Sequence, residues 1–175
     1  MRILPVAVAL LLSAPLVLAQ NGAPPSLLAD WQRDKGNVLA YLEAMPESGL
    51  GFRPTPGVRT FAQQFEHIVA SNVDVAALAL LGQARSPQLG DSTQYLHSKA
   101  ALRAYVVAAY DFVLDAIARA SREQWRRSSS MYGQPPELPA RWFALAHEHS
   151  VWTLGQVVPY VRLNRVTPPA YQMPF

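Results

Sequence analysis

Apolar residues recur every three or four positions along four long stretches of the chain, with polar residues between them. This period is typical of amphipathic α-helices. The first stretch predicts a helix over 26–45, and Pro46 ends it because a proline has no N–H to donate. The polar face of this helix, which we expect to be exposed, consists of Asp30, Arg33, Asp34 and Lys35.

A second helix is predicted over 60–81, after a loop at 47–59 that is rich in glycine and proline. Thr60 is suited to the N-cap, since its hydroxyl can accept from a free backbone N–H. Gln63, three residues on, completes the pattern of a capping box. Gly82 is predicted to end the helix, because glycine adopts the left-handed backbone that often follows a helix.

The two remaining periodic stretches predict helices over 99–120, capped by Ser98, and over 140–163. The segments between the helices, 82–98 and 121–139, are polar or rich in serine and proline. Four helices without a strand pattern predict an all-α fold, a single four-helix bundle.

Pro159 lies inside the fourth helix, where it cannot donate to the carbonyl of Gly155. We therefore predict a kink there, which would relieve packing or open space in the core.

Composition limits the chemistry that the chain can perform. The 175 residues contain no cysteine, which excludes disulfides, a thiolate nucleophile and cysteine-ligated metal centres. The 15 lysines and arginines against 12 acidic residues are scattered, which argues against a nucleic-acid partner. Half of the residues are apolar, enough for a core.

Residues 1–19 have the pattern of a secretory signal peptide, with Arg2 before an apolar run and small residues before Gln20. We expect cleavage there and a domain of residues 20–175 that is secreted, periplasmic or held in the cell envelope. No later apolar run reaches the length of a membrane span, so no integral span remains after cleavage.

Two histidines are the main candidates for chemistry. His67 lies on the second predicted helix, and His149 shares a face of the fourth with Thr153 and Gln156. His147 lies about 200° away from His149 around that helix, so the two cannot easily hold one ion. A His-x3-His pair would suit a metal, but Thr153, a neutral hydroxyl, occupies its second position.

Three interpretations of these residues stay open. His67 and His149 bind a divalent metal, or they are buried polar residues satisfied by hydrogen bonds. Alternatively, Gln63, His67, His149 and Gln156 line a polar pocket in which a neutral histidine acts as a base. No acidic partner at helical spacing orients either histidine, which favours a protein that is not an enzyme.

Several short motifs carry a family resemblance through their order and spacing. They are Met45-Pro46-Glu47, Phe52-Arg53-Pro54-Thr55-Pro56, Arg59-Thr60-Phe61, His67-Ile68, the run from Gly155-Gln156 to Asn164, and Pro168-Pro169. The chain resembles the DinB-like (DinB/YfiT) superfamily over nearly all of residues 20–175. The resemblance implies an up-down-down-up bundle.

The resemblance also implies a metal site, formed by one histidine on the second helix and a His-x3-His pair before the Gly-Gln of the fourth. His67 matches the first ligand and His149 the second, while Thr153 stands at the third. Nickel, zinc or iron at His67 and His149 is therefore the implied cofactor, in a degenerate site.

Some relatives resemble thiol-dependent transferases or isomerases, in which the metal activates a small cytoplasmic thiol. A secreted chain with an incomplete triad lacks both parts of that arrangement. The alternatives are thus a metal-free periplasmic binding or interaction module and a metal- and thiol-dependent transferase. The partners left open are a second copy of the chain and a small-molecule ligand.

Overall fold

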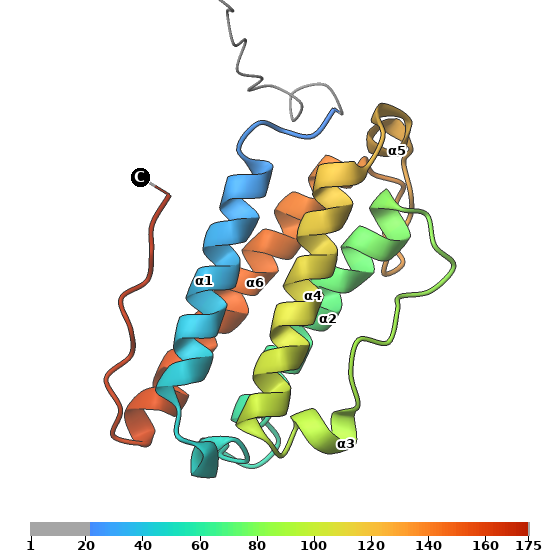
Figure 1. The fold of residues 1–175 in the computed structure, drawn as a ribbon. Coiled ribbons are helices and arrows are strands. Elements are labelled where there is room, and N and C mark those ends of the chain that lie inside the picture. Colours follow the sequence, from blue (N-terminus) through green and yellow to red (C-terminus); the bar gives the residue numbers. More distant parts are fainter. Residues whose placement is uncertain (1–21, 175) are drawn as a thin grey trace, which may run out of the picture.

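The computed structural model describes residues 22–174, so the predicted signal peptide lies outside the described residues. Within these residues four long helices form a bundle (Figure 1), which confirms the all-α prediction. They are α1 (Leu27–Ala44), α2 (Phe61–Asp74), α4 (Lys99–Arg119) and α6 (Pro139–Leu163). Two short helices, α3 (Ser92–Tyr95) and α5 (Arg122–Arg126), lie in the connections 82–98 and 121–139, where the sequence analysis expected no helix. Within residues 22–174, no helix is long and apolar enough to cross a membrane.

The helices follow the up-down-down-up course. α1 and α6 run in one direction and α2 and α4 in the other, and the 82–98 connection returns the chain along the length of the bundle (Figure 1). Around the bundle, α1 contacts α4 and α6, and α2 contacts the same two helices. The long connection is required because α2 and α4 run in the same direction.

Local sequence signals account for both ends of the second helical segment. The Thr60 hydroxyl accepts from the Gln63 backbone N–H (3.2 Å), and the Gln63 side chain accepts from the Thr60 N–H (2.9 Å). At the other end, Gly82 adopts φ 69°, a conformation that glycine reaches without a steric penalty.

The second predicted helix, over 60–81, is not one regular α-helix. After α2 it continues as η3 (Val75–Leu80), which is a π-helix, and the Leu81 N–H donates to the Ala76 carbonyl (3.0 Å) five residues back. The wider turn lets five of the six residues of η3 be buried. It contacts both α4 and α6.

The fourth helix continues through Pro159 to Leu163. Gly155 and Pro159 both lie on its exposed face. The Gly155 carbonyl that Pro159 cannot satisfy is therefore on the solvent side of α6, so any space opened by the proline is outside the core. The kink itself stays a prediction.

Asp34 is fully buried, so the expectation that it faces solvent is wrong. It lies three residues after Trp31 and four before Val38, on the same stripe as these two core residues. Its Oδ2 accepts from the Tyr110 hydroxyl (2.6 Å) and from the Ser150 hydroxyl (2.8 Å). These two donors offset part of the cost of burying a carboxyl group.

Asn72 extends this buried network by donating from Nδ2 to the Tyr110 hydroxyl (3.4 Å). Each of the four long helices thus contributes one member: Asp34, Asn72, Tyr110 and Ser150. Burial raises the pKa of Asp34, an effect that the hydrogen bonds from Tyr110 and Ser150 and the nearby His147 and Arg33 oppose.

Candidate functional site

His67 and His149 lie in contact at the interface of α2 and α6. Their Nε2 atoms are 2.9 Å apart, and the two rings meet edge to face with centroids 4.7 Å apart. Each side chain is partly buried. The structure thus brings together the two histidines that the sequence pattern singled out.

Thr153 stands one turn beyond His149 on α6, with its Oγ1 3.5 Å from His149 Nε2. It is buried beside the pair. Gln63 uses its side-chain oxygen in the helix cap, and Gln156 is exposed on α6. Of the residues proposed to line a polar pocket, Gln63 borders one pocket together with His67, and His149 borders another.

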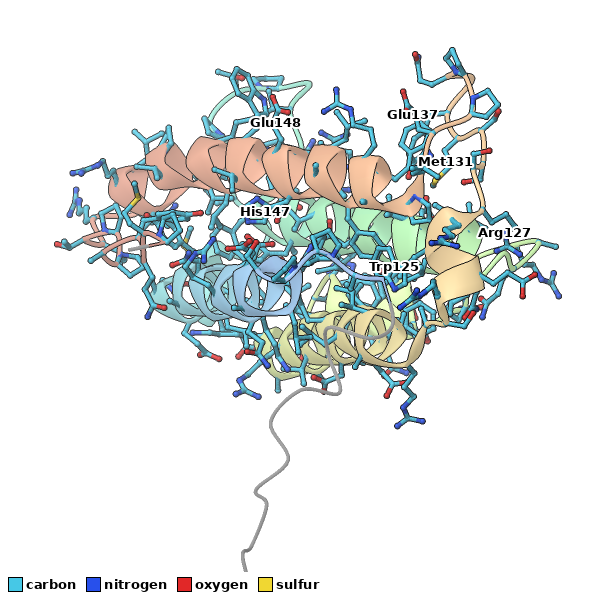
Figure 2. All side chains as sticks on the ribbon, turned by 90° about the horizontal axis from the view of Figure 1, so that it is seen from above. Trp125, Arg127, Met131, Glu137, His147 and Glu148 are labelled. Carbon is cyan, nitrogen blue, oxygen red and sulfur yellow. The ribbon has the colours of Figure 1, made fainter. Side chains whose placement is uncertain are left out.

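His147 is directed away from this pair, as its position on the helix predicts. Its ring lies against Trp31 of α1, with centroids 6.1 Å apart. Figure 2 shows His147 on the inner side of α6 and Glu148 on its outer side. Neither residue therefore adds a ligand to His67 and His149.

The surroundings of His67 and His149 lower the pKa of both side chains, which favours neutral imidazoles at neutral pH. Burial lowers the pKa of His67, and the nearby charges of Arg59 and His149 lower it further. Burial and Arg59 lower the pKa of His149 in the same way. Neutral imidazoles can either ligate a metal or share one hydrogen bond through Nε2.

One atom of the pair has no partner. His149 Nδ1 is buried and makes no hydrogen bond. With a proton that nitrogen is an unsatisfied buried donor, and without one it is an unsatisfied buried acceptor, so either tautomer carries a cost of about 1–3 kcal/mol there.

A metal at the pair would have two imidazole ligands and few others. Among residues 22–174, no group of three or more His, Cys, Asp or Glu side chains is placed to hold an ion. Two nitrogens bound to one ion at about 2.0–2.1 Å are about 2.9 Å apart when the angle at the ion is a right angle, as in an octahedral site, and about 3.3 Å apart at the tetrahedral angle of zinc. The observed separation of 2.9 Å matches the right angle, and it is also the length of the hydrogen bond between the two nitrogens. The residues present therefore fit an ion held by two ligands with open positions, and not a closed site.

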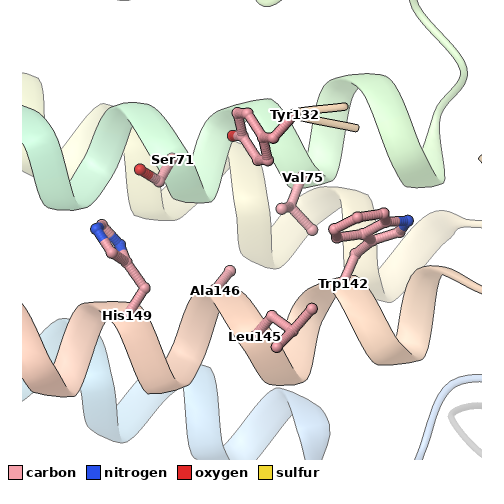
Figure 3. A pocket seen from close by; sticks show the side chains of 7 residues that line it. All are labelled: Ser71, Val75, Tyr132, Trp142, Leu145, Ala146 and His149. Atoms are coloured by element: carbon pink, nitrogen blue, oxygen red, sulfur yellow. The ribbon is translucent and has the colours of Figure 1, made fainter. Parts of the chain in front are cut away.

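Space adjoins the histidines on two sides. One cavity, of about 240 Å³, is largely apolar and has His149 at one end and Trp142 at the other (Figure 3). A more open pocket lies beside His67 and includes Arg59, Gln63 and Glu66.

The sequence analysis missed the residues of the apolar cavity other than His149, which are Ser71, Val75, Tyr132, Trp142, Leu145 and Ala146. Trp142, Leu145 and His149 recur at three- and four-residue steps, which is the signal that could have linked them.

A sequence model of the DinB superfamily matches residues 30–157, which include both histidines and most of the bundle. The chain belongs to the DinB superfamily. A search of curated proteins found no match.

The solved structures of two DinB-like proteins from Bacillus have the same fold as this chain. One, from Bacillus subtilis, is 16% identical with a TM-score of 0.69, over 85% of this chain and 99% of that one. The other, from Bacillus cereus, is 15% identical with a TM-score of 0.70, over 87% and 99%. At these identities the likeness supports the helical bundle and carries no activity across.

Proposed function

We propose that this DinB-superfamily protein binds a divalent transition metal weakly through His67 and His149. The observation that carries the proposal is the 2.9 Å separation of the two Nε2 atoms. Two neutral imidazoles so close together suit nickel, zinc or iron. Thr153 and water would occupy further positions, since the Thr153 hydroxyl lies 3.5 Å from His149 Nε2.

Two features argue that the affinity is low. The third side chain is a neutral hydroxyl, which adds no charge to the ligand set. Metal bound at Nε2 would also place the His149 proton on Nδ1, where the structure offers no acceptor. Metal-bound histidines normally donate that proton to a partner, whose loss costs about 10–100-fold in affinity. An ion held there would supply a Lewis acid with open positions for an exogenous ligand.

Metal analysis of protein purified without a histidine tag tests this proposal, together with calorimetric titration of nickel and zinc. We expect saturable binding of one ion, weakened at least about tenfold when His67→Ala and His149→Ala are combined. His97→Ala is the matched control, because His97 is an exposed histidine distant in sequence from both. Equal binding by the double variant and the control, or no binding by the parent protein, would contradict the proposal.

A second candidate function is a metal-free module that binds a small molecule. The apolar cavity beside His149 favours it, because concave apolar sites with a few polar groups are where small ligands bind. Ligand binding by chelator-treated protein would support this function, and binding that requires added metal would oppose it.

Secretion remains part of the proposal, on the pattern of residues 1–19. Mass spectrometry of the protein recovered from the cell envelope tests it. We expect a chain that begins at Gln20, and a chain that retains Arg2 would contradict cleavage.

A further inference from the structure

The apolar cavity beside His149 has a composition that selects among ligands. It lies between the α2–η3 segment and α6, with Tyr132 above Val75 as part of its wall (Figure 3). Three of its side chains are aromatic or imidazole rings: Tyr132, Trp142 and His149. Flat rings prefer to meet other rings edge to face or offset, so these walls favour a ligand that is itself aromatic.

No lining side chain is charged at neutral pH. Ser71, the only lining side chain with an aliphatic hydroxyl, donates to the His67 carbonyl (3.0 Å) and keeps its own oxygen free to accept. The cavity is partly open to solvent, so an ion placed in it would lose part of its hydration without gaining a counter-charge from the lining residues, which is costly. An uncharged ligand with one small hydrogen-bonding group meets no such cost.

The wall formed by Tyr132 is held in place by contacts at both sides of its loop. The Tyr132 hydroxyl donates to Asp74 Oδ2 (3.1 Å), and its backbone has φ 52°, which is uncommon for a residue other than glycine. The loop is closed by Ser129 and Glu137, whose backbones exchange hydrogen bonds of 3.0 and 3.1 Å. Trp142 Nε1 donates to the Ser129 carbonyl (2.9 Å). The aromatic wall is therefore formed before a ligand arrives, which reduces the cost of binding.

The volume sets the size of the ligand. An apolar cavity of about 150 Å³ holds one benzene molecule. The 240 Å³ here leaves room for one ring and a small substituent. We propose that this cavity binds an uncharged, single-ring aromatic molecule with one small hydrogen-bonding group, in contact with Trp142, Tyr132 and His149. The proposal rests on the metal-free binding function suggested above and requires no ion.

Phenol and benzoate are the probes that test it, because they share a ring and differ in charge. Each is titrated into chelator-treated protein while the indole N–H resonance of Trp142 is followed by NMR. We expect phenol to shift this resonance saturably, and benzoate to bind at least about tenfold more weakly.

Two variants locate the ligand. Ala146→Leu places extra carbons inside the cavity and should weaken phenol binding by about tenfold or more. Ala144→Leu is the matched control, because Ala144 is exposed on the same helix, and it should leave binding unchanged. Tyr132→Ala removes one aromatic wall from a loop position that is 62% exposed, so it tests the site without a change in the core. It should weaken phenol binding several-fold.

The outcomes separate the ligand class from the binding function. If benzoate binds as well as or better than phenol and Ala146→Leu removes its binding, the cavity is a binding site and the uncharged class is wrong. If phenol and benzoate both leave the Trp142 resonance unshifted, the ligand class and the binding function suggested for this cavity are both overturned. Phenol binding that Ala146→Leu and Tyr132→Ala leave intact would place the ligand elsewhere and overturn the assignment.

Discussion

Tyr110→Phe is the substitution that best tests the buried network at the centre of the bundle. The tyrosine is 1% exposed, and its hydroxyl both donates to Asp34 (2.6 Å) and accepts from Asn72 (3.4 Å). Removing a hydrogen bond to an ionised carboxylate such as that of Asp34 costs about 1.5–3 kcal/mol in stability. The substitution also leaves the buried Asn72 amide without its acceptor, which lowers the stability further. The bond from Asn72 is long, so we expect a total loss of about 2–4 kcal/mol in the free energy of unfolding at neutral pH.

The cost should depend on pH, because it depends on the charge of Asp34. Burial raises the pKa of Asp34 above its unfolded value, and the titratable groups that face it are His147, Arg33 and the Tyr110 phenol. The stability that Asp34 contributes is therefore fully present below the unfolded pKa and is lost as the pH rises through the folded pKa. Without the Tyr110 hydroxyl, the folded pKa rises further and the loss at neutral pH grows. Below the unfolded pKa of about 3.9 the carboxyl is protonated in both states, and the variant should lose only about 0.5–1.5 kcal/mol there.

Urea unfolding followed by far-ultraviolet circular dichroism measures both values, with an unchanged m-value as evidence that the unfolding transition is the same. Tyr41→Phe is the control, because Tyr41 is buried on α1 and takes no part in the network. Combining Tyr110→Phe with Asp34→Asn should reveal a coupling of about 1–3 kcal/mol. Equal costs at the two pH values, or additive effects of the two substitutions, would refute the reasoning.

Three further predictions concern the histidine pair and one helix end. Thr153→His should tighten nickel or zinc binding at least about tenfold by calorimetry, and an unchanged affinity would show that position 153 does not reach the ion. Gly82→Ala should lower the free energy of unfolding by about 1 kcal/mol or more because of the positive φ, whereas Gly51→Ala, in open space, should cost less. By NMR, His67 and His149 should titrate below the usual pKa of about 6.5. Stability should then fall as the pH drops below 6.5 through their folded values, and midpoints at or above 6.5 would contradict the stated burial effect.

Local signals in the sequence sufficed for most of the bundle. The Thr60–Gln63 capping box and the glycine at 82 act within a few residues, so their geometry could be predicted without knowledge of the fold. The pairing of His67 with His149 was one of several interpretations of the residues, and the resemblance supported it by supplying the helix arrangement, because helical periodicity alone does not say which faces meet.

Features that depend on distant partners were not predictable in this way. Asp34 was placed on the exposed face because it is charged. The hydroxyls that donate to its buried carboxylate belong to Tyr110 and Ser150, which lie 76 and 116 residues away. Tyr132 likewise is positioned by Asp74, 58 residues away, so its place in the cavity wall could not be inferred from the loop. Long-range hydrogen bonds decided both cases.

The π-helical segment η3 makes the number of residues between α2 and Gly82 a constraint on the protein. A π turn holds about one residue more than an α turn and keeps the faces on either side aligned, so one further residue inserted in Val75–Leu80 would rotate one side of the segment by about 100° relative to the other. Either Val75 would leave the cavity or Leu80 would leave the core. The exposed connection that follows can lose or gain residues without such a rotation. Among natural variants of this chain, insertions should therefore fall after Gly82, while substitutions within η3 that keep small or apolar side chains are accepted.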